Sequence, residues 1–267
     1  MRTALLLRTV AAFEASILMP TPRLARSVRP ASIRAARRCF SARVNAEAPE
    51  ETDTDPIRWT DAMALPNNDD NEQLLRIRHS TAHVMAMAVQ KLFKGTKVSI
   101  GPWIEKGFYY DFDPPEPFQE KDLRRIKKEM DKFIQMKLPF TEEVVTREEA
   151  ERRIREQDEP YKLEILNRIK SDKITIWHTS RNQDGWWDLC AGPHVATTGD
   201  LPKDAIALES IAGAYLFGDE KGPMLQRIYG TAWENKEQLE EHVRLQAEAK
   251  RRDHRMIGKQ LNLFSIQ

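Results

Sequence analysis

The sequence predicts an α+β protein with a largely antiparallel sheet. Short runs with strand character are separated by turn residues, and segments with helical periodicity lie beside them. Neither an internal repeat nor a phosphate-binding loop of the G-x-x-x-x-G-K type occurs in the sequence. Strands joined by short turns, with helices packed against them, favour a mixed fold of this kind over a parallel βαβ arrangement.

The first predicted helix runs from about residue 72 to residue 93 and ends at Lys94-Gly95, where glycine can adopt the left-handed conformation that stops a helix. His79 and His83 are four residues apart and therefore point the same way. An apolar stripe on the same helix is formed by Ala82, Met85, Val89 and Leu92. At about 100° per residue, both imidazoles are expected at the border of the core rather than inside it.

The remaining elements follow from alternation, helical periodicity and turn residues. Strands are expected at residues 98–102, 107–113, 140–145, 174–179, 186–189, 206–212, 214–217 and 224–229. Helices are expected at residues 120–136, 147–156 and 161–169, and from 236 to about 260. The last helix is long and highly charged, so we interpret it as a connector.

Charge is distributed unevenly along the chain. Residues 1–43 carry nine Arg against Glu14 alone, which leaves a charge of −7 on residues 44–267. An Arg-rich, acid-poor segment with interspersed apolar residues is typical of an organellar presequence. Residues 38–41 (RCFS) resemble a mitochondrial processing site. We therefore expect a mitochondrial protein, with a plastid as the alternative and a basic RNA-binding arm as a third interpretation.

Four regions are expected from these features. They are a targeting presequence (1–43), an acidic flexible linker (44–71), the folded domain (72–235) and the connector helix (236–267). No apolar run approaches the roughly 20 residues that span a bilayer, so no membrane partner is expected. Cys39 and Cys190 lie in segments of different character, which does not indicate a disulfide framework.

Residues 188–194 (DLCAGPH) combine a carboxylate, a thiol and an imidazole at the end of a predicted strand. The Gly-Pro pair predicts a turn through which Cys190 and His194 can converge. With His79 and His83, they can form a tetrahedral zinc site, or a metal-free hydrolytic pocket with His as general base. They can also form a Cys nucleophile activated by His, or a purely structural cluster. His178, His242 and His254 are interpreted as structural or solvent-exposed.

Several motifs, taken in their order along the chain, resemble those of a known family. This family is the editing domain of threonyl-tRNA synthetase, which is related to the editing domain of alanyl-tRNA synthetase. H-x-x-x-H is followed about a hundred residues later by C-x-x-x-H. The further motifs are residues 212–215 (AGAY), 218–221 (GDEK) and 224–233 (MLQRIYGTAW). Residues 100–102 (IGP), 107–111 (GFYYD) and 250–261 (KRRDHRMIGKQL) favour the threonyl branch.

The resemblance implies a deacylase that hydrolyses the ester of serine mischarged on threonine tRNA, in a cleft between sheet and helices. By carry-over, the catalytic set is His79, His83, Lys162, Cys190 and His194. Asp188 would bind the serine amine, and Tyr110 would shape the pocket or contact the terminal adenosine. The threonyl branch implies no required cofactor. In the alanyl relatives, the positions of His79, His83, Cys190 and His194 hold zinc.

The resemblance begins near residue 72 and ends where an aminoacylation core should begin. We expect no ATP site in this chain, and either a free-standing editing protein or a truncated threonine-tRNA ligase. A zinc-dependent editing protein of the alanyl type and a non-catalytic tRNA-binding module are further alternatives. The implied partners are the aminoacylated 3′ end of a tRNA and a full-length synthetase.

Overall fold

The computed structural model describes residues 65–181 and 185–252. The chain divides into two units, Met1–Asp55 and Pro56–Gln267, and every described residue belongs to the second. The predicted presequence, residues 44–64 of the predicted linker and residues 253–267 of the predicted connector lie outside the described residues. Cys39 and His254 lie outside them as well.

Helices and strands alternate irregularly along the described chain. In order, they are α1 (Glu72–Leu92), β1 (Lys97–Val98), β2 (Trp103–Ile104), β3 (Gly107–Asp113), α2 (Glu120–Gln135), β4 (Phe140–Thr146), α3 (Arg147–Glu156), α4 (Pro160–Arg168), β5 (Lys173–Thr179), β6 (Trp186–Leu189), β7 (Ile206–Tyr215), β8 (Met224–Ala232) and α5 (Lys236–Arg251). Most predicted elements are present with boundaries shifted by one or two residues.

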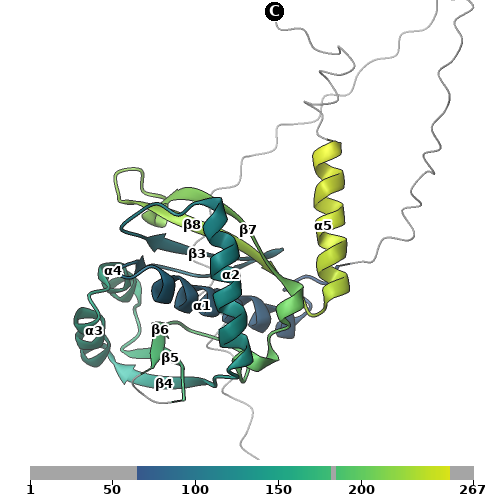
Figure 1. Ribbon diagram of the computed structural model, residues 1–267. Helices are drawn as coiled ribbons and strands as arrows, with labels where there is room; N and C mark the ends of the chain where they lie inside the picture. The colour runs from purple at the N-terminus through teal and green to yellow at the C-terminus, as the bar shows by residue number, and fades with distance from the viewer. Residues whose placement is uncertain (1–64, 182–184, 253–267) are drawn as a thin grey trace, which may run out of the picture. The chain divides into compact units, whose positions relative to one another are not determined.

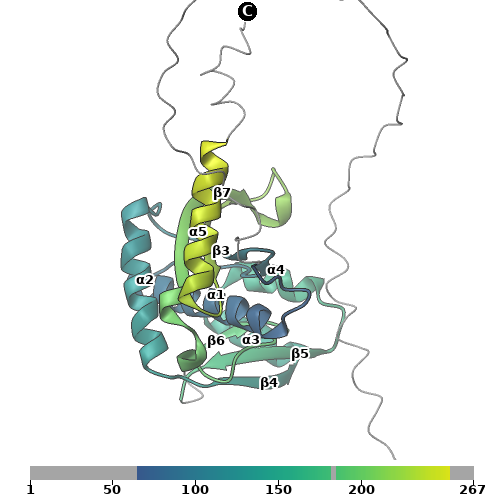
Figure 2. The ribbon, with the colours of Figure 1, turned by 90° about the vertical axis from the view of Figure 1, so that its right-hand side faces the viewer.

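The strands form two antiparallel sheets. One has the order β1-β3-β8-β7, with β2 paired to β3, and the other has the order β4-β5-β6. Every strand pair in the described part of the chain is antiparallel. Helix α1 lies between the two sheets, and α2 packs on α1 and β7 (Figures 1 and 2). The fold is therefore α+β, as predicted, although its strands belong to two sheets rather than one.

Helix α1 is buried around its whole circumference from Ile77 to Val89. The expectation that its imidazoles lie at the border of the core is therefore wrong: His83 is 2% exposed and His79 is 9% exposed. The reason is tertiary. Strands β3 and β8 cover one side of α1, while α2 and side chains from the second sheet cover the others.

Residues 65–71, the end of the predicted linker, contact the domain. The Asn68 amide donates a hydrogen bond to the Ile104 carbonyl (2.8 Å), and its oxygen accepts one from Arg78 (2.6 Å). The Asn71 side chain accepts the Leu74 N–H (3.0 Å) and so caps the first turn of α1. The packed structure thus includes residues that precede Glu72.

The strands predicted at 206–212 and 214–217 form one strand, β7, which ends at Tyr215. Its pairing with β8 continues from Ile206↔Ala232 to Tyr215↔Met224, with an irregularity between Leu208 and Ser210. Ladder hydrogen bonds carry the strand through Gly213, a position that local propensity alone treats as a break. Likewise, β2 rather than β1 forms the tight hairpin with β3.

The second sheet has its own apolar core with α3 and α4. Buried side chains of this core include Ile154, Leu166, Ile174, Ile176 and Leu189. This part of the fold carries Lys162 on α4 and Asp188 on β6, and it places both beside α1. No helix in the described ranges is both long and apolar enough to cross a membrane.

Candidate functional site

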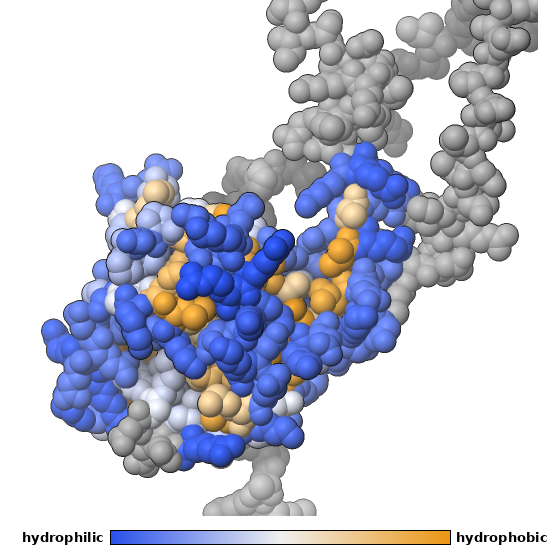
Figure 3. Space-filling model, in the orientation of Figure 1, coloured by the Kyte–Doolittle hydropathy of each residue, from blue (hydrophilic) through white to orange (hydrophobic). Residues whose placement is uncertain are grey.

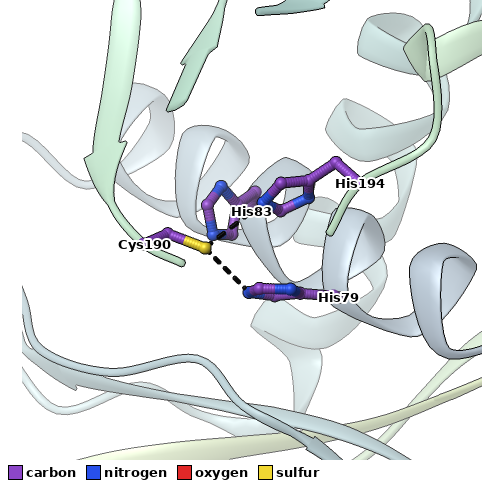
Figure 4. A group of neighbouring side chains, drawn as sticks. All are labelled: His79, His83, Cys190 and His194. Carbon is purple, nitrogen blue, oxygen red and sulfur yellow. Dashed lines mark hydrogen bonds between the residues drawn. The ribbon is translucent and has the colours of Figure 1, made fainter. Parts of the chain in front are cut away.

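Four potential ligand side chains meet between α1 and the loop that follows β6. His79 and His83 come from α1, whereas Cys190 and His194 come from the loop (Figure 4). One nitrogen or sulfur atom from each side chain lies within 4.8 Å of those of the others. Cys190 Sγ is 3.1 Å from His79 Nε2 and 3.3 Å from His194 Nε2. The predicted convergence of these four residues is confirmed.

The loop conformation brings Cys190 and His194 together. Gly192 has a φ of +72°, and the Gly192–Pro193 peptide is cis. A Cβ at Gly192 would also approach the Trp177 ring to 2.9 Å, so a glycine suits this position on both counts. The Gly192 N–H donates to Cys190 Sγ (3.1 Å), which holds the sulfur toward the imidazoles.

His194 is held by neighbours that the sequence did not single out. Its Nδ1 is 3.0 Å from Ser80 Oγ, which also accepts the Val195 N–H (3.0 Å). The Phe140 ring stacks parallel to the imidazole at 5.0 Å, and Trp177 packs edge-on at 4.7 Å. Only the position of Ser80 next to His79 in the sequence could have indicated that it belongs to this site. No sequence pattern indicated Phe140 or Trp177.

Burial controls the protonation of this cluster. It lowers the pKa of His79 to about 4 and holds the pKa values of His83 and His194 well below their ordinary value. It raises the pKa of the Cys190 thiol well above its ordinary value. The imidazoles are therefore neutral near pH 7, and the thiol keeps its proton. A Cys nucleophile is disfavoured, because the thiolate is the reactive form.

A second group of buried polar residues lies directly beside the imidazoles. Lys162 forms an ion pair with Asp188 Oδ1, and Tyr110 donates a hydrogen bond to Asp188 Oδ2 (2.6 Å). Lys162 Nζ also donates to the Tyr110 hydroxyl oxygen (3.0 Å), while His83 Nε2 lies 3.6 Å from Asp188 Oδ2. The seven predicted site residues thus form one continuous constellation.

This second group differs from the sequence-based interpretation in one respect. Asp188, the predicted amine ligand, is already paired with Lys162 and Tyr110. Burial, followed by the neighbouring Asp188 charge, holds the pKa of Tyr110 well above its ordinary value. Tyr110 therefore remains a hydroxyl donor. An incoming cation would have to share Asp188 with these partners.

Zinc suits the donor types of the first cluster, which are three imidazoles and one thiol. The Ser80 contact on His194 Nδ1 is of the kind that orients a metal-bound histidine. His79 and His83 lack such a contact, because the Nδ1 atom of each is buried without a hydrogen-bond partner, and His83 Nε2 also lies beside Asp188. The cluster therefore meets some of the requirements of a structured zinc site and lacks others.

Two further residues lie just behind the constellation and were missed from the sequence. Gln90 Oε1 accepts the Trp186 indole N–H (2.7 Å), and Gln90 Nε2 donates to Glu159 Oε1 (2.8 Å). Burial raises the pKa of Glu159 to about 7. Neither residue belongs to a motif, so only the packing of α1 against α4 and β6 identifies them.

The other described histidines have structural partners, as predicted. His178 Nε2 lies 2.7 Å from Glu143 Oε2, and His242 packs against Trp233 and lies 3.1 Å from Glu209 Oε1. His242 also lines a cavity of about 360 Å³ between α5 and the sheet, and no residue of the constellation lines this cavity. Apolar side chains are visible along α5 in this region (Figure 3).

Comparison with known proteins supports the family resemblance. Residues 181–229 match the family model described as the threonyl and alanyl tRNA synthetase second additional domain. The chain is 61% identical over 205 residues to the chloroplastic/mitochondrial threonine–tRNA ligase 2 of Arabidopsis thaliana, covering 77% of this chain and 31% of that protein. It is 64% identical over 200 residues to the threonine–tRNA ligase of Thermosynechococcus vestitus, covering 75% and 32%.

A third relative extends the same pattern. The threonine–tRNA ligase of a Synechocystis strain is 59% identical over 204 residues, which cover 76% of this chain and 33% of that protein. The chain thus spans about a third of the length of the curated relatives that it matches.

The neutral imidazoles predict that the metal-free protein loses stability as the pH falls from about 6.5 to about 4. His79 has a pKa of about 4 in the folded chain, against 6.5 for the exposed side chain. In this window the unfolded chain binds a proton that the folded chain does not. This contribution to stability is therefore complete above pH 6.5 and is lost toward pH 4. Urea unfolding at several pH values gives the free energy of unfolding as a function of pH. Between about pH 4 and 6.5, the slope of this plot for the wild type and that for His79→Gln should differ by the uptake of about one proton on unfolding. Equal slopes would contradict a neutral buried His79.

Proposed function

We propose that this chain, which resembles the threonyl-tRNA synthetase editing-domain family, is an aminoacyl-tRNA deacylase. Its substrate would be serine esterified to the 3′-terminal ribose of threonine tRNA. The observation that carries the proposal is the continuous constellation of neutral imidazoles, a buried Lys–Asp pair and a Tyr hydroxyl. The family match and the threonine–tRNA ligase relatives support it.

Such an activity answers a physical limit on recognition. Serine lacks one methyl group of threonine, and a pocket that binds threonine rejects the smaller side chain by only about 1–3 kcal/mol. A second site that admits serine and excludes threonine by size supplies the missing discrimination. The buried, closely packed surroundings of the constellation suit selection by size, because close-packed interiors do not accept an extra methyl group cheaply.

The proposed chemistry is ester hydrolysis by an activated water. A neutral imidazole of the cluster takes a proton as the water oxygen attacks the serine carbonyl carbon. The carbonyl oxygen becomes an oxyanion, which Lys162 and the Tyr110 hydroxyl can stabilise. The tetrahedral intermediate then collapses, and the ribose 3′-oxygen leaves with the proton from the imidazolium. The products are free serine and uncharged tRNA, so no cofactor is consumed.

Asp188 would bind the ammonium group of the serine. In the structure it is paired with Lys162 and Tyr110, so the substrate would join a group whose charges are already balanced. We propose that Lys162 then turns from Asp188 toward the developing oxyanion. This exchange would tie substrate binding to the placement of the catalytic cation.

Zinc-dependent deacylation, as in the alanyl relatives, is the second candidate. It is favoured by the four donor atoms that lie within 4.8 Å of one another. His79, His83, Cys190 and His194 would hold the ion, which when bound would supply a water of lowered pKa. Threonine–tRNA ligation, the activity in the relatives' names, is an alternative only for a full-length form that includes this chain, and tRNA binding without catalysis is a further alternative. An aminoacylation assay with ATP and threonine tests the first, and tRNA binding without ester loss would indicate the second.

Serine release should be selective and should depend on the constellation. Seryl-tRNA should lose its amino acid while threonyl-tRNA remains charged, and His79→Ala or Lys162→Ala should slow release by about 10²- to 10⁴-fold. The measurement is the decay of each labelled ester, with circular dichroism to verify folding. His178→Ala is the matched control, because this buried His lies outside the constellation. Stable ester with the wild type, or full activity of either variant, would refute the proposal.

The metal question has its own test. We expect deacylation to be unaffected by dialysis against a chelator, and purified protein to contain far less than one zinc per chain. Elemental analysis and the rate after dialysis measure both quantities. One equivalent of zinc, with activity lost on removal and restored on its return, would favour the alanyl-type alternative.

The basic segment 1–43 is proposed to direct the protein to the mitochondrion, with a plastid as the alternative. The name of the Arabidopsis relative refers to both organelles and supports organellar import without distinguishing them. A fluorescent protein fused to residues 1–43 should enter mitochondria, whereas replacing the nine Arg of the segment with Gln should leave it outside. Exclusive plastid signal would favour the alternative, and diffuse signal from the unaltered segment would contradict both.

A further inference from the structure

We infer that Glu159 and Gln90 act as a positioning pair that holds the Lys162 side chain in place relative to His83 and Asp188. This inference rests on the proposed deacylase function and deepens it. Neither residue belongs to the constellation that contacts the proposed substrate. Both act through the elements that carry it.

Glu159 joins the start of α4 to two other elements. It is the N-cap residue of α4, and its carbonyl accepts the Lys162 N–H (3.1 Å), so Lys162 lies in the first helical turn. Its side chain makes no capping bond to its own helix. Instead, Oε2 accepts the Val98 N–H of β1 (2.9 Å), and Oε1 accepts the Gln90 amide of α1 (2.8 Å). With 7% exposure, the carboxylate has little access to water as a substitute partner.

Gln90 extends this connection to the elements that carry the other two residues. It lies seven residues after His83 on α1, which is about two turns along the same face. Its Oε1 accepts the Trp186 indole N–H of β6 (2.7 Å). Trp186 lies two residues before Asp188, and its ring packs edge-on against His83 with centroids 5.5 Å apart. Two hydrogen bonds therefore link α4, α1 and β6 behind the site, and a third joins α4 to β1.

The direction of these hydrogen bonds fixes the chemistry of each member. Both Glu159 oxygens face N–H donors, and the Gln90 oxygen faces the indole donor. A Gln at position 159 would turn an N–H₂ group toward Val98 N–H or toward the Gln90 amide. A Glu at position 90 would place two carboxylates together. Exchanging the residues restores every donor–acceptor pair except the long 3.4 Å contact from the Gln90 amide to the Thr96 carbonyl.

This reciprocity provides the experiment. Seryl-tRNA deacylation is measured for wild type, Glu159→Gln, Gln90→Glu and the exchanged double variant. Each single variant should lower kcat by about 10- to 100-fold with little change in KM, because misplacement of a catalytic group by about 1 Å can cost that much. The double variant should recover to within about threefold of wild type, the remainder reflecting the lost Thr96 contact. Single variants with wild-type kcat, or a folded double variant that remains as slow as them, would overturn the inference.

A second set of hydrogen bonds, at the other end of α4, supplies the matched control. Arg147 donates hydrogen bonds to the carbonyls of Leu166 and Ser171, at the far end of α4 from Lys162. Arg147→Ala should lower the midpoint of thermal unfolding yet leave kcat within about twofold of wild type. The reason is that hydrogen bonds lost away from the site change mainly the stability of the fold. An equal loss of kcat in Arg147→Ala and Glu159→Gln would reduce the pair to a general stabiliser and overturn the inference.

An NMR measurement separates this inference from the proposed function. With ¹³Cε-labelled lysine, the Lys162 signal, assigned by its absence in Lys162→Met, should shift in both single variants and return in the double variant. If wild type hydrolyses neither ester, the proposed function fails while this signal still tests positioning. An unchanged signal in Glu159→Gln would overturn positioning even if deacylation is found. If a single variant does not fold, the double variant decides: a wild-type Lys162 signal supports the inference and a displaced one overturns it.

Discussion

The burial of α1 between two sheets is the constraint on which the rest of this structure depends. Thirteen successive residues, from Ile77 to Val89, are buried, and several of them are polar. A buried polar group without a partner costs free energy, so hydrogen bonds to neighbouring elements stabilise this helix. Arg78 finds the Ala232 and Glu105 carbonyls, and Ser80 finds His194 and Val195. The same helix therefore organises both the core and the candidate site.

Burial also determines the chemistry that the site can perform. Removing water disfavours the charged imidazole, so three histidines close together remain neutral and able to accept a proton. Lys162 and Asp188 lie beside the imidazoles as an ion pair in which the two charges compensate each other. A neutral base beside a balanced ion pair suits the hydrolysis of a neutral ester, in which negative charge develops during the reaction.

Two parts of the fold contribute to the constellation, and their alignment needs its own support. The first sheet and α1 supply Tyr110, His79 and His83, whereas the second sheet and α4 supply Asp188 and Lys162. Apolar packing joins the two parts, because Phe140 of β4 belongs to the core around α1, and Trp177 and Trp186 of the second sheet pack against that core. Polar links that cross between the parts, such as Gln90 to Glu159, are also placed to set the distance between the two sets.

Sequence alone predicted most elements, the α+β class and the seven candidate residues, of which Lys162 and Tyr110 were implied only by the family resemblance. The elements and the four-residue cluster follow from local properties: helical spacing places His79 beside His83, and the Gly-Pro turn returns His194 toward Cys190. Tertiary structure decided that the imidazoles are buried, that the strands divide into two sheets, that 206–215 is one strand and that Asp188 is already paired. It alone identified Ser80, Gln90 and Glu159. Periodicity describes which side of a helix is apolar, but the depth of burial depends on what packs around it, and protonation and pairing follow that depth.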